Sequence, residues 1–289
     1  MDIFDMGLFG MEDFSFDDMA CDILLIGPVR EEEDEKVNGE VIRQSMLLSP
    51  YGYELTLLNT CSCRQYDRLQ DIIDAQKEDD SQKSMPASCG ASLSTDLMSD
   101  LEHCKVISVC GLFEEDALST DALLEILKKG KESKALVCLD PGRVIHPQED
   151  RERLRRLAPY IDYILPNTEE AGLLSGQDYP VMMAQSLLDT GIGCVVITMG
   201  SQGCFVKGQE APFAMGALPC GERCAEDMTG MGVNFASGFL YGLFQDWQIK
   251  TICEYASGCA AVSSFYPDPV QHAVKRKDEV KKLLKNPYL

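Results

Sequence analysis

Basic residues are in short supply in this sequence. Its 289 residues include 26 lysines and arginines against 47 aspartates and glutamates, a formal net charge of -21. Such a charge repels the phosphates of nucleic acids and the surfaces of anionic membranes. We therefore expect neither nucleic acid nor membrane as a partner. An anionic small molecule would need local Lys, Arg, Mg²⁺ or backbone N–H groups to overcome this field.

Residues that bind transition metals are also scarce. The sequence has no CxxC pair and only three histidines, namely His103, His146 and His272. Structural zinc and iron sites draw on closely spaced Cys and His, so we expect no dedicated metal site. The 13 cysteines are an odd number in a long chain without a recognisable signal peptide. This predicts buried, reduced thiols and a cytoplasmic protein.

Long hydrophobic runs are missing as well. No stretch approaches about 18 uninterrupted apolar residues, so a membrane span is not predicted. Residues 1–20 alternate acidic with apolar residues and contain no Lys or Arg. We interpret them as a tail or a docking segment in front of one domain over 21–289. The polar, serine-rich range 76–100 is predicted to be a mobile loop within that domain.

Short apolar runs, in contrast, recur along the chain and are typical of strands buried on both faces. They cover residues 21–27, 54–59, 105–111, 135–142 and 194–200. Helical patterns alternate with the later runs, for example over 119–133, which begins with Ser and Thr and ends in lysines. Further helices are predicted over 233–245, 251–265 and 274–285. The pattern predicts an α/β fold with a doubly wound, mainly parallel sheet and helices on both faces.

Polar and glycine residues follow the predicted strands, where ligands bind in such sheets. The most informative segment is 227–242, DMTGMGVNFASGFLYG, a glycine-containing loop that leads into a helix. Gly230 and Gly232 permit backbone conformations that direct N–H groups at one point, and a helix N-terminus favours negative charge. The segment thus has the outline of an anion hole. Gly-x-Gly turns before helices also occur where nothing binds.

Asp227, Thr229, Gly230 and Gly232 match a signature of the ribokinase-like (PfkB) family of carbohydrate and nucleoside kinases, which this segment resembles. Three further segments are similar to that family and occur in its order. They are LDPGR (139–143), ILPNTEEAGLLSG (164–176) and VVITMGSQGCFV (195–206). The resemblance implies a ribokinase-like fold, a small-molecule substrate such as a sugar or nucleoside, and Mg and ATP as cofactors.

The resemblance also implies roles for individual positions, each matched to a residue of this sequence. An anion hole would surround the transferring phosphoryl group, one set of residues would bind the nucleotide and its magnesium, and another would bind the acceptor substrate. The anion hole would be formed by Gly230, Met231 and Gly232, the nucleotide and magnesium site by Asn167, Glu170, Thr198, Gly200, Gly203 and Cys259, and the substrate site by Asn38 and Gly39. A plain tight turn is the alternative interpretation of the two glycines in TMGSQG.

Two departures from the family pattern bear on activity. Val233 stands where the family has the aspartate that takes the proton from the attacking hydroxyl, and loss of a general base costs about 10²–10⁴ in rate. Only Asn38 and Gly39 occupy the place of the family's paired glycines, and the β-strand lid is predicted to be reduced or absent. A missing lid would leave an edge or face to cover, which makes a homodimer a reasonable expectation.

Three hypotheses about function follow. The first is an ATP-dependent kinase of a sugar or nucleoside, weakened by Val233. The second is a pseudokinase that binds a nucleotide or metabolite without catalysis and serves as a sensor or regulatory subunit. The third is an assembly protein that docks through residues 1–20.

Overall fold

The protein is described by a computed structural model, which covers residues 22–28, 30–31, 37–38, 40–48, 53, 55–60, 87–89, 101–114, 118–219, 231–266 and 277–285. Its main feature is a nine-stranded sheet in the order β11-β10-β9-β8-β7-β6-β1-β4-β5. The strands are β1 (Ile23–Gly27), β4 (Leu55–Asn59), β5 (Ala87–Cys89), β6 (Val106–Cys110), β7 (Leu136–Asp140), β8 (Tyr163–Ile164), β9 (Cys194–Thr198), β10 (Cys204–Lys207) and β11 (Phe213–Met215).

All paired strands run parallel except β10, which is antiparallel to both of its neighbours. The mainly parallel sheet predicted from the five apolar runs is therefore confirmed. In a parallel sheet the carboxyl ends of the strands share one edge, and the loops that follow them lie close together. We call this the carboxyl edge.

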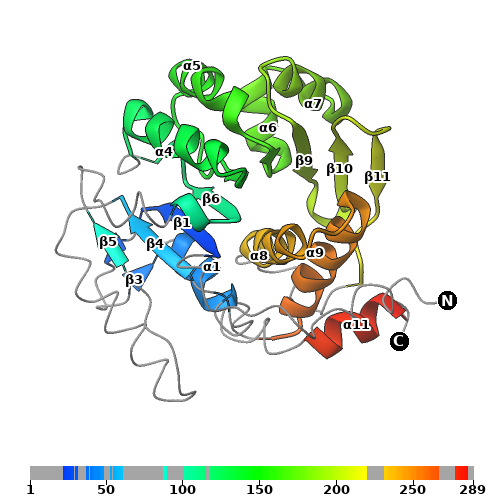
Figure 1. Ribbon diagram of the computed structural model, residues 1–289. Coiled ribbons are helices and arrows are strands. Elements are labelled where there is room, and N and C mark those ends of the chain that lie inside the picture. The colour runs from blue at the N-terminus through cyan, green and yellow to red at the C-terminus, as the bar shows by residue number, and fades with distance from the viewer. Residues whose placement is uncertain are drawn as a thin grey trace.

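Helices cover both faces of the sheet, as predicted (Figure 1). The helices α4 to α7 lie on one face, and α1, α8 and α9 lie on the other, with α11 packed on α9. Their bounds are α1 (Glu40–Leu48), α4 (Thr120–Glu132), α5 (Pro147–Leu157), α6 (Thr168–Ser175), α7 (Pro180–Leu188), α8 (Met231–Phe244), α9 (Ile249–Ser263) and α11 (Lys277–Lys285).

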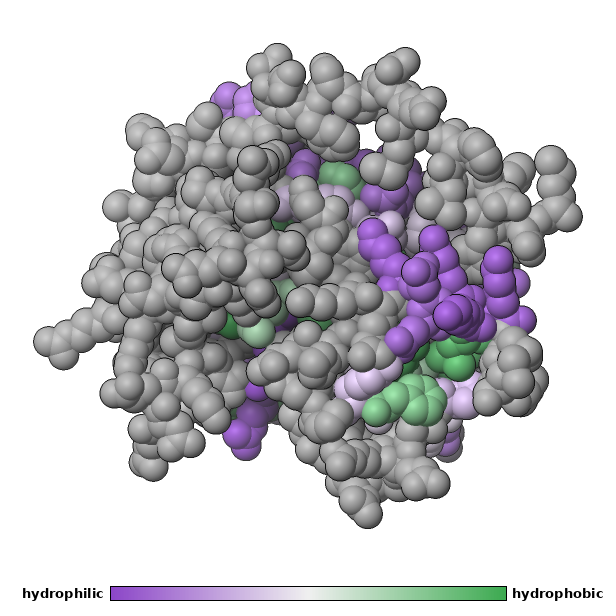
Figure 2. Space-filling model, turned by 90° about the horizontal axis from the view of Figure 1, so that it is seen from below, coloured by the Kyte–Doolittle hydropathy of each residue, from purple (hydrophilic) through white to green (hydrophobic). Residues whose placement is uncertain are grey.

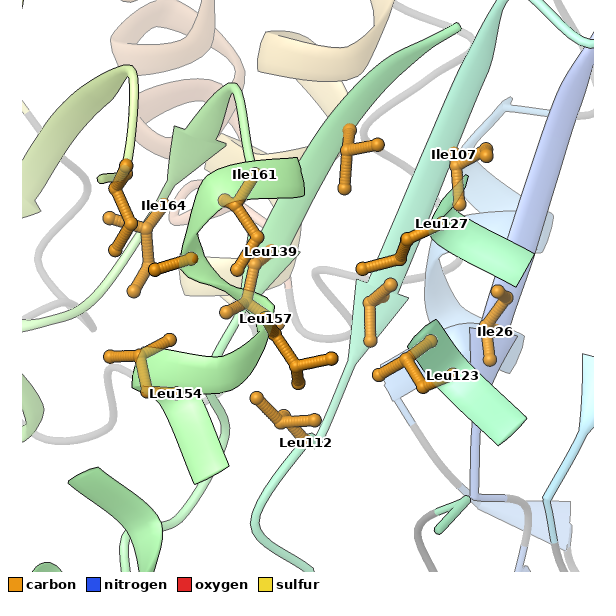
Figure 3. Close-up of a cluster of buried hydrophobic side chains, with 14 of the residues drawn as sticks. Ile26, Ile107, Leu112, Leu123, Leu127, Leu139, Leu154, Leu157, Ile161 and Ile164 are labelled. Atoms are coloured by element: carbon orange, nitrogen blue, oxygen red, sulfur yellow. The ribbon is translucent and has the colours of Figure 1, made fainter. Parts of the chain in front are cut away.

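The two-faced core follows from alternation along the strands, whose successive side chains point to opposite sides. In β1, Ile26 packs on the side of α4 and α5, whereas Ile23 and Leu25 pack on the side of α1 and α8. Figure 3 shows the first of these cores, in which strand residues such as Ile107 meet helix residues such as Leu127. Both faces are apolar, so the strands appear in the sequence as continuous hydrophobic runs.

The C-terminal helix α11 explains the basic segment at the end of the chain. Val280 is 1% exposed and lies against α9, where a Cβ on Gly258 would be 2.7 Å from the Val280 Cγ1 atom. Lys282 and Lys285 are exposed on α11, and hydrophilic side chains gather at that part of the surface (Figure 2). Lys277 instead lies over the Tyr241 ring of α8, with Nζ 4.8 Å from the ring centroid.

A second, much smaller sheet lies between β1 and α1. It pairs β2 (Arg30–Glu31) with β3 (Val37–Asn38) in antiparallel register. Most of the range 60–104, where a lid pattern was sought in the sequence, lies outside the described residues, so the reduced lid stays a prediction. Part of the predicted mobile loop is also described, since β5 lies inside 76–100 and pairs with β4 at the edge of the sheet. Residues 1–20 lie outside the described residues.

The described residues also bear on membranes and thiols. None of the helices among them is long and apolar enough to cross a membrane. The seven cysteines in the described part form no disulfide; they are Cys104, Cys110, Cys138, Cys194, Cys204, Cys253 and Cys259. All but Cys194 are buried, which agrees with the interpretation of these thiols as small core residues.

Candidate functional site

The helices α1 and α8 begin at the carboxyl edge of the sheet, beside the loops that follow the strands. The end of α8 lies at the opposite edge, because Lys105, which directly precedes β6, donates a hydrogen bond to the Phe244 carbonyl. Tyr53, which follows α1, packs on the same end, with its ring centroid 4.3 Å from that of Phe244. The starts of both helices, at Glu40 and Met231, therefore lie at the carboxyl edge together.

Asn167 and Glu170 form a capping box at the start of α6. The Glu170 N–H donates to Asn167 Oδ1 at 2.9 Å, and the Asn167 N–H donates to Glu170 Oε2 at 2.9 Å. This pair satisfies two backbone donors that the helix leaves unpaired. The Asn-x-x-Glu pattern therefore has a local structural cause in addition to the ligand role expected of it.

Thr198 ends β9 directly beside Asn167. The two residues form an isolated parallel bridge, and the Thr198 N–H donates to the Pro166 carbonyl at 2.9 Å. The Thr168 hydroxyl donates to the Thr198 carbonyl at 3.3 Å. Residues 31 positions apart in the sequence are thus adjacent at the carboxyl edge.

Gly200 and Gly203 form the tight turn between β9 and β10. Both have positive φ, +56° and +91°, and the Gly203 N–H donates to the Gly200 carbonyl at 3.0 Å. A Cβ on Gly203 would lie 1.9 Å from the Met215 carbonyl oxygen of β11, so only glycine fits there. We call Asn167, Glu170, Thr198, Gly200 and Gly203 the nucleotide side of the site, after the role expected of them.

Two glycine turns follow β6 and β7 and pack on each other. Gly111 and Gly142 both have φ of +64°, and a Cβ on Gly142 would lie 2.7 Å from the Cα of Gly111. The carboxylate of Glu114 lies over both glycines, 2.9 Å and 3.3 Å from the positions of such Cβ atoms. Asp140 Oδ1 accepts a hydrogen bond from the Gly142 N–H at 3.2 Å. Two carboxylates thus lie at the end of neighbouring strands.

Glu40, the first residue of α1, faces the same place. Its pKa is raised to about 8, first by burial and then by the charge of Asp140, with smaller contributions from Glu114 and Glu170. The guanidinium of Arg43, 3.7 Å from Glu40 Oε2, opposes this rise. Burial also raises the pKa of Asp140 to about 6, and burial together with Asp140 raises that of Glu170 to about 8. Burial and neighbouring acidic side chains therefore disfavour ionisation of Glu40, Asp140 and Glu170 at the carboxyl edge.

The start of α8 carries the position of greatest interest, Val233. Its side chain is 2% exposed, whereas Gly232 is exposed, and among the described residues no atom lies within 4 Å of where its Cβ would be. The first N–H groups of a helix have no partner within the helix, and helix starts of this kind can bind anions. Met231 lies in the same first turn. Gly230 lies outside the described residues, as do the matching Asp227 and Thr229. We call Glu40, Gly232 and Val233 the acceptor side of the site.

The remaining predicted residues lie in different surroundings. Cys259 is 6% exposed between α8 and α9, and its sulfur would be 2.9 Å from a Cβ on Gly238. Its role beside the adenine stays a prediction. Asn38 ends β3, in register with Arg30, and Gly39 lies outside the described residues. Asn38 and Gly39 directly precede Glu40 in the chain.

Sequence reasoning missed the acidic group formed by Glu40, Glu114, Asp140 and Glu170. These residues are far apart in the sequence, and surface acids are common in a chain of this charge. A signal did exist for two of them, because Asp140 ends a predicted strand and Glu114 comes shortly after one. Polar residues at the ends of parallel strands tend to converge.

Comparison with known proteins identifies the family of the chain. The model of the pfkB family of carbohydrate kinases matches residues 82–270, which is more than half of the chain. The chain belongs to this family. The sequence-based recognition is thereby confirmed at the level of the family.

Two curated relatives that are similar in sequence have different activities. An ATP-dependent 6-phosphofructokinase from Thermoanaerobacterium thermosaccharolyticum is 28% identical over 145 residues, which are 49% of this chain and 44% of the relative. A cytidine kinase from Thermococcus kodakarensis is 30% identical over 132 residues, 45% of this chain and 47% of the relative. The matched region thus spans less than half the length of each relative.

Solved structures extend the likeness over nearly the whole fold. Arabidopsis thaliana ribokinase complexed with ribose and ATP has a TM-score of 0.74 at 16% identity, with 92% of this chain and 99% of the other covered. A putative ribokinase II from E. coli in complex with ATP and Mg²⁺ has a TM-score of 0.70 at 17% identity, with 92% and 99% covered. At such identities the likeness establishes the ribokinase-like fold.

Proposed function

We propose that the protein transfers the γ-phosphoryl group of ATP to a hydroxyl of a sugar or nucleoside, at a rate lowered by Val233. The observation that carries this proposal is the position of the open α8 start at the same edge as the nucleotide side. Phosphoryl transfer relies mostly on alignment and charge stabilisation, which these elements can supply without a perfect base. The 6-phosphofructokinase and cytidine kinase relatives support this reaction class.

In this proposal the first turn of α8 stabilises the charge that develops on the transferring group. Helix N–H groups are fixed in direction before the reaction, so they cost no reorganisation when the charge appears. The open surface at Gly232 gives the phosphoryl oxygens access to these N–H groups. Gly230 and Met231 complete the anion hole expected from the family pattern.

Magnesium fits the chemistry of the nucleotide side. In the described residues no group of three or more His, Cys, Asp or Glu side chains is arranged to hold a metal ion. Mg²⁺ however usually keeps several waters and binds one or two carboxylates together with substrate phosphates. Glu170 would serve in this way with Asn167, because only one of its carboxylate oxygens is used by the capping box. When bound, the ion would neutralise phosphate charge next to mutually repelling carboxylates.

The second candidate function is a pseudokinase that binds a nucleotide or metabolite without phosphoryl transfer. Buried Val233 and the two-residue strands of the small sheet favour it. Both candidates require nucleotide or metabolite binding, and they differ in turnover.

Titration calorimetry with Mg·ATP tests the first requirement. We expect saturable binding that weakens without Mg²⁺. A coupled assay of ADP release with fructose 6-phosphate, ribose and cytidine as acceptors then separates the candidates. Slow, acceptor-dependent turnover supports the kinase, and binding without turnover supports the pseudokinase. Vigorous turnover would contradict a loss of function at Val233, and absence of Mg·ATP binding would contradict both candidates.

A further inference from the structure

The starts of α1 and α8 are neighbours at the carboxyl edge. The two helices pack side by side, since Val41 and Ile42 of α1 share a core with Phe235 and Phe239 of α8. The start of α1 also lies against the end of β1, because a Cβ on Gly27 would be 3.3 Å from the Cβ of Val41. Glu40 is therefore at the same end of the molecule as Val233, on the adjacent helix.

Glu40 differs from the other three acids in how its carboxylate is engaged. Asp140 accepts the Gly142 N–H, Glu170 accepts the Asn167 N–H, and the carboxylate of Glu114 is packed over two glycines. Among the described residues Glu40 forms one ion pair, with Arg43 at 3.7 Å, and its side chain is 26% exposed. The Glu40 side chain thus contacts solvent at the site. Among the described residues, no backbone N–H donates a hydrogen bond to its carboxylate.

We propose that Glu40 accepts the proton of the attacking hydroxyl in place of the aspartate that Val233 replaces. This inference rests on the proposed function. The hydroxyl oxygen forms a bond to the γ-phosphorus of ATP while the bond from that phosphorus to the β,γ-bridging oxygen breaks and ADP leaves. The hydroxyl proton passes to the Glu40 carboxylate and from there to solvent. The position of Glu40 directly after Asn38 and Gly39, the predicted substrate residues, places it where an acceptor hydroxyl would arrive.

The electrostatics of Glu40 suit this role. A general base works best when its pKa is close to the working pH, and that of Glu40 is raised to about 8. The groups that face it are Asp140 at the end of β7, Glu114 after β6, Glu170 on α6 and Arg43 on α1. Since the ionised carboxylate is the active form, the rate rises as pH increases through about 8.

The primary test replaces Glu40 by glutamine and measures ADP release with ribose, cytidine and fructose 6-phosphate from pH 6 to 9. We expect Glu40→Gln to lose about 10²-fold in kcat and all of the rise near pH 8, with Mg·ATP affinity maintained and the melting temperature not lowered. The control Glu125→Gln removes the same charge from the exposed face of α4 and should leave the rate unchanged. An unchanged pH profile in Glu40→Gln would overturn the inference.

Two further variants exclude a purely structural role. Glu114→Gln removes a charge that raises the pKa of Glu40, so the rate profile should move to lower pH. Adding Val233→Asp to Glu40→Gln should restore turnover, because a base returns to the adjacent helix. A profile that stays in place in Glu114→Gln, or a double variant that stays inactive, counts against Glu40 as the base. Failure of the parent protein to bind Mg·ATP, or binding without any acceptor turnover, defeats the proposed kinase function itself. Acceptor-dependent turnover that Glu40→Gln leaves unchanged defeats the Glu40 inference alone.

Discussion

The nucleotide side and the acceptor side of the site are built in different ways. On the nucleotide side, a capping box, a strand bridge and a glycine turn are fixed by backbone hydrogen bonds. On the acceptor side, the main features are an open helix start, a buried valine and a carboxylate among other acids. Backbone-defined geometry tolerates substitution of side chains, whereas proton transfer depends on one functional group. We therefore expect the acceptor side to be the more sensitive of the two to a single substitution.

The difference between the two sides is tested most strongly by placing a carboxylate on α8 at position 233. We expect Val233→Asp to raise kcat for phosphoryl transfer by about 10²–10⁴ in the Glu40→Gln background, since the base would stand next to the anion hole, and by less in the parent chain, where Glu40 accepts the proton. Mg·ATP affinity, measured by calorimetry, should change little. Valine-to-leucine substitution at the same position is the matched control and should give no gain. A null result with intact ATP binding would place the defect in the acceptor pocket instead.

Two glycine substitutions compare the turn between β9 and β10 with the start of α8. Gly203→Ala forces a Cβ against the Met215 carbonyl at a backbone conformation reserved for glycine, so unfolding should become easier by at least about 1–3 kcal/mol. Gly232→Ala meets no atom within 4 Å, so its stability should be preserved while access of phosphate to the helix start is reduced. Urea unfolding and ATP calorimetry on both variants provide the comparison. Equal stabilities would show that the turn between β9 and β10 is not a rigid element.

Substitutions at Glu170 separate its capping role from its charge. Glutamine can accept the Asn167 N–H as glutamate does, and alanine cannot. Glu170→Ala should therefore be less stable than Glu170→Gln by about 0.5–1.5 kcal/mol in chemical unfolding. Both variants should weaken Mg·ATP binding in calorimetry if the carboxylate helps to hold the ion. Tighter binding in both would mean that Glu170 acts only by repelling the phosphates.

The acidic group should also be visible in the pH dependence of stability. Burial and like charges raise the pKa of Glu40 and Glu170 from 4.5 to about 8, and that of Asp140 to about 6. The folded state therefore binds these protons more tightly than the unfolded state, and stability is lost as pH rises through this range. We expect the melting temperature to fall by about 2–4 °C between about pH 5.5 and 8.5. Glu40→Gln should flatten the decline, and a melting temperature that rises with pH would contradict the raised pKa values of these acids.

The fold could be predicted from the sequence because its strands are buried on both faces. The apolar runs 105–111 and 194–200 became β6 and β9 with their ends shortened by one or two residues. Short elements without a hydrophobic run were not recognisable, as the two-residue β8 and the edge strand β5 show. The positions of these strands depend on pairing with neighbouring strands, and the β-propensity of their own residues does not define them.

The site was predictable to a lesser extent. Motif order brought Asn167 and Thr198 together correctly, because both follow strands of one parallel sheet. The importance of Glu40 depends on which acids surround it, and burial and mutual repulsion are three-dimensional properties that spacing does not record. The capping box could have been read from Asn167 and Glu170, three residues apart before an apolar stretch.

The central location of β1 has a consequence for how the protein reaches its fold. This strand is wholly buried, yet its partners β4 and β6 begin about 30 and 80 residues further along the chain. Closing such loops costs conformational entropy before the contacts between the strands form. Pairing between strands that are distant in sequence therefore slows folding. During synthesis β1 leaves the ribosome before both of its partners, and its apolar side chains stay uncovered until β6 follows. An early strand of the described sheet is thus enclosed late, and chaperones would have a long opportunity to bind there.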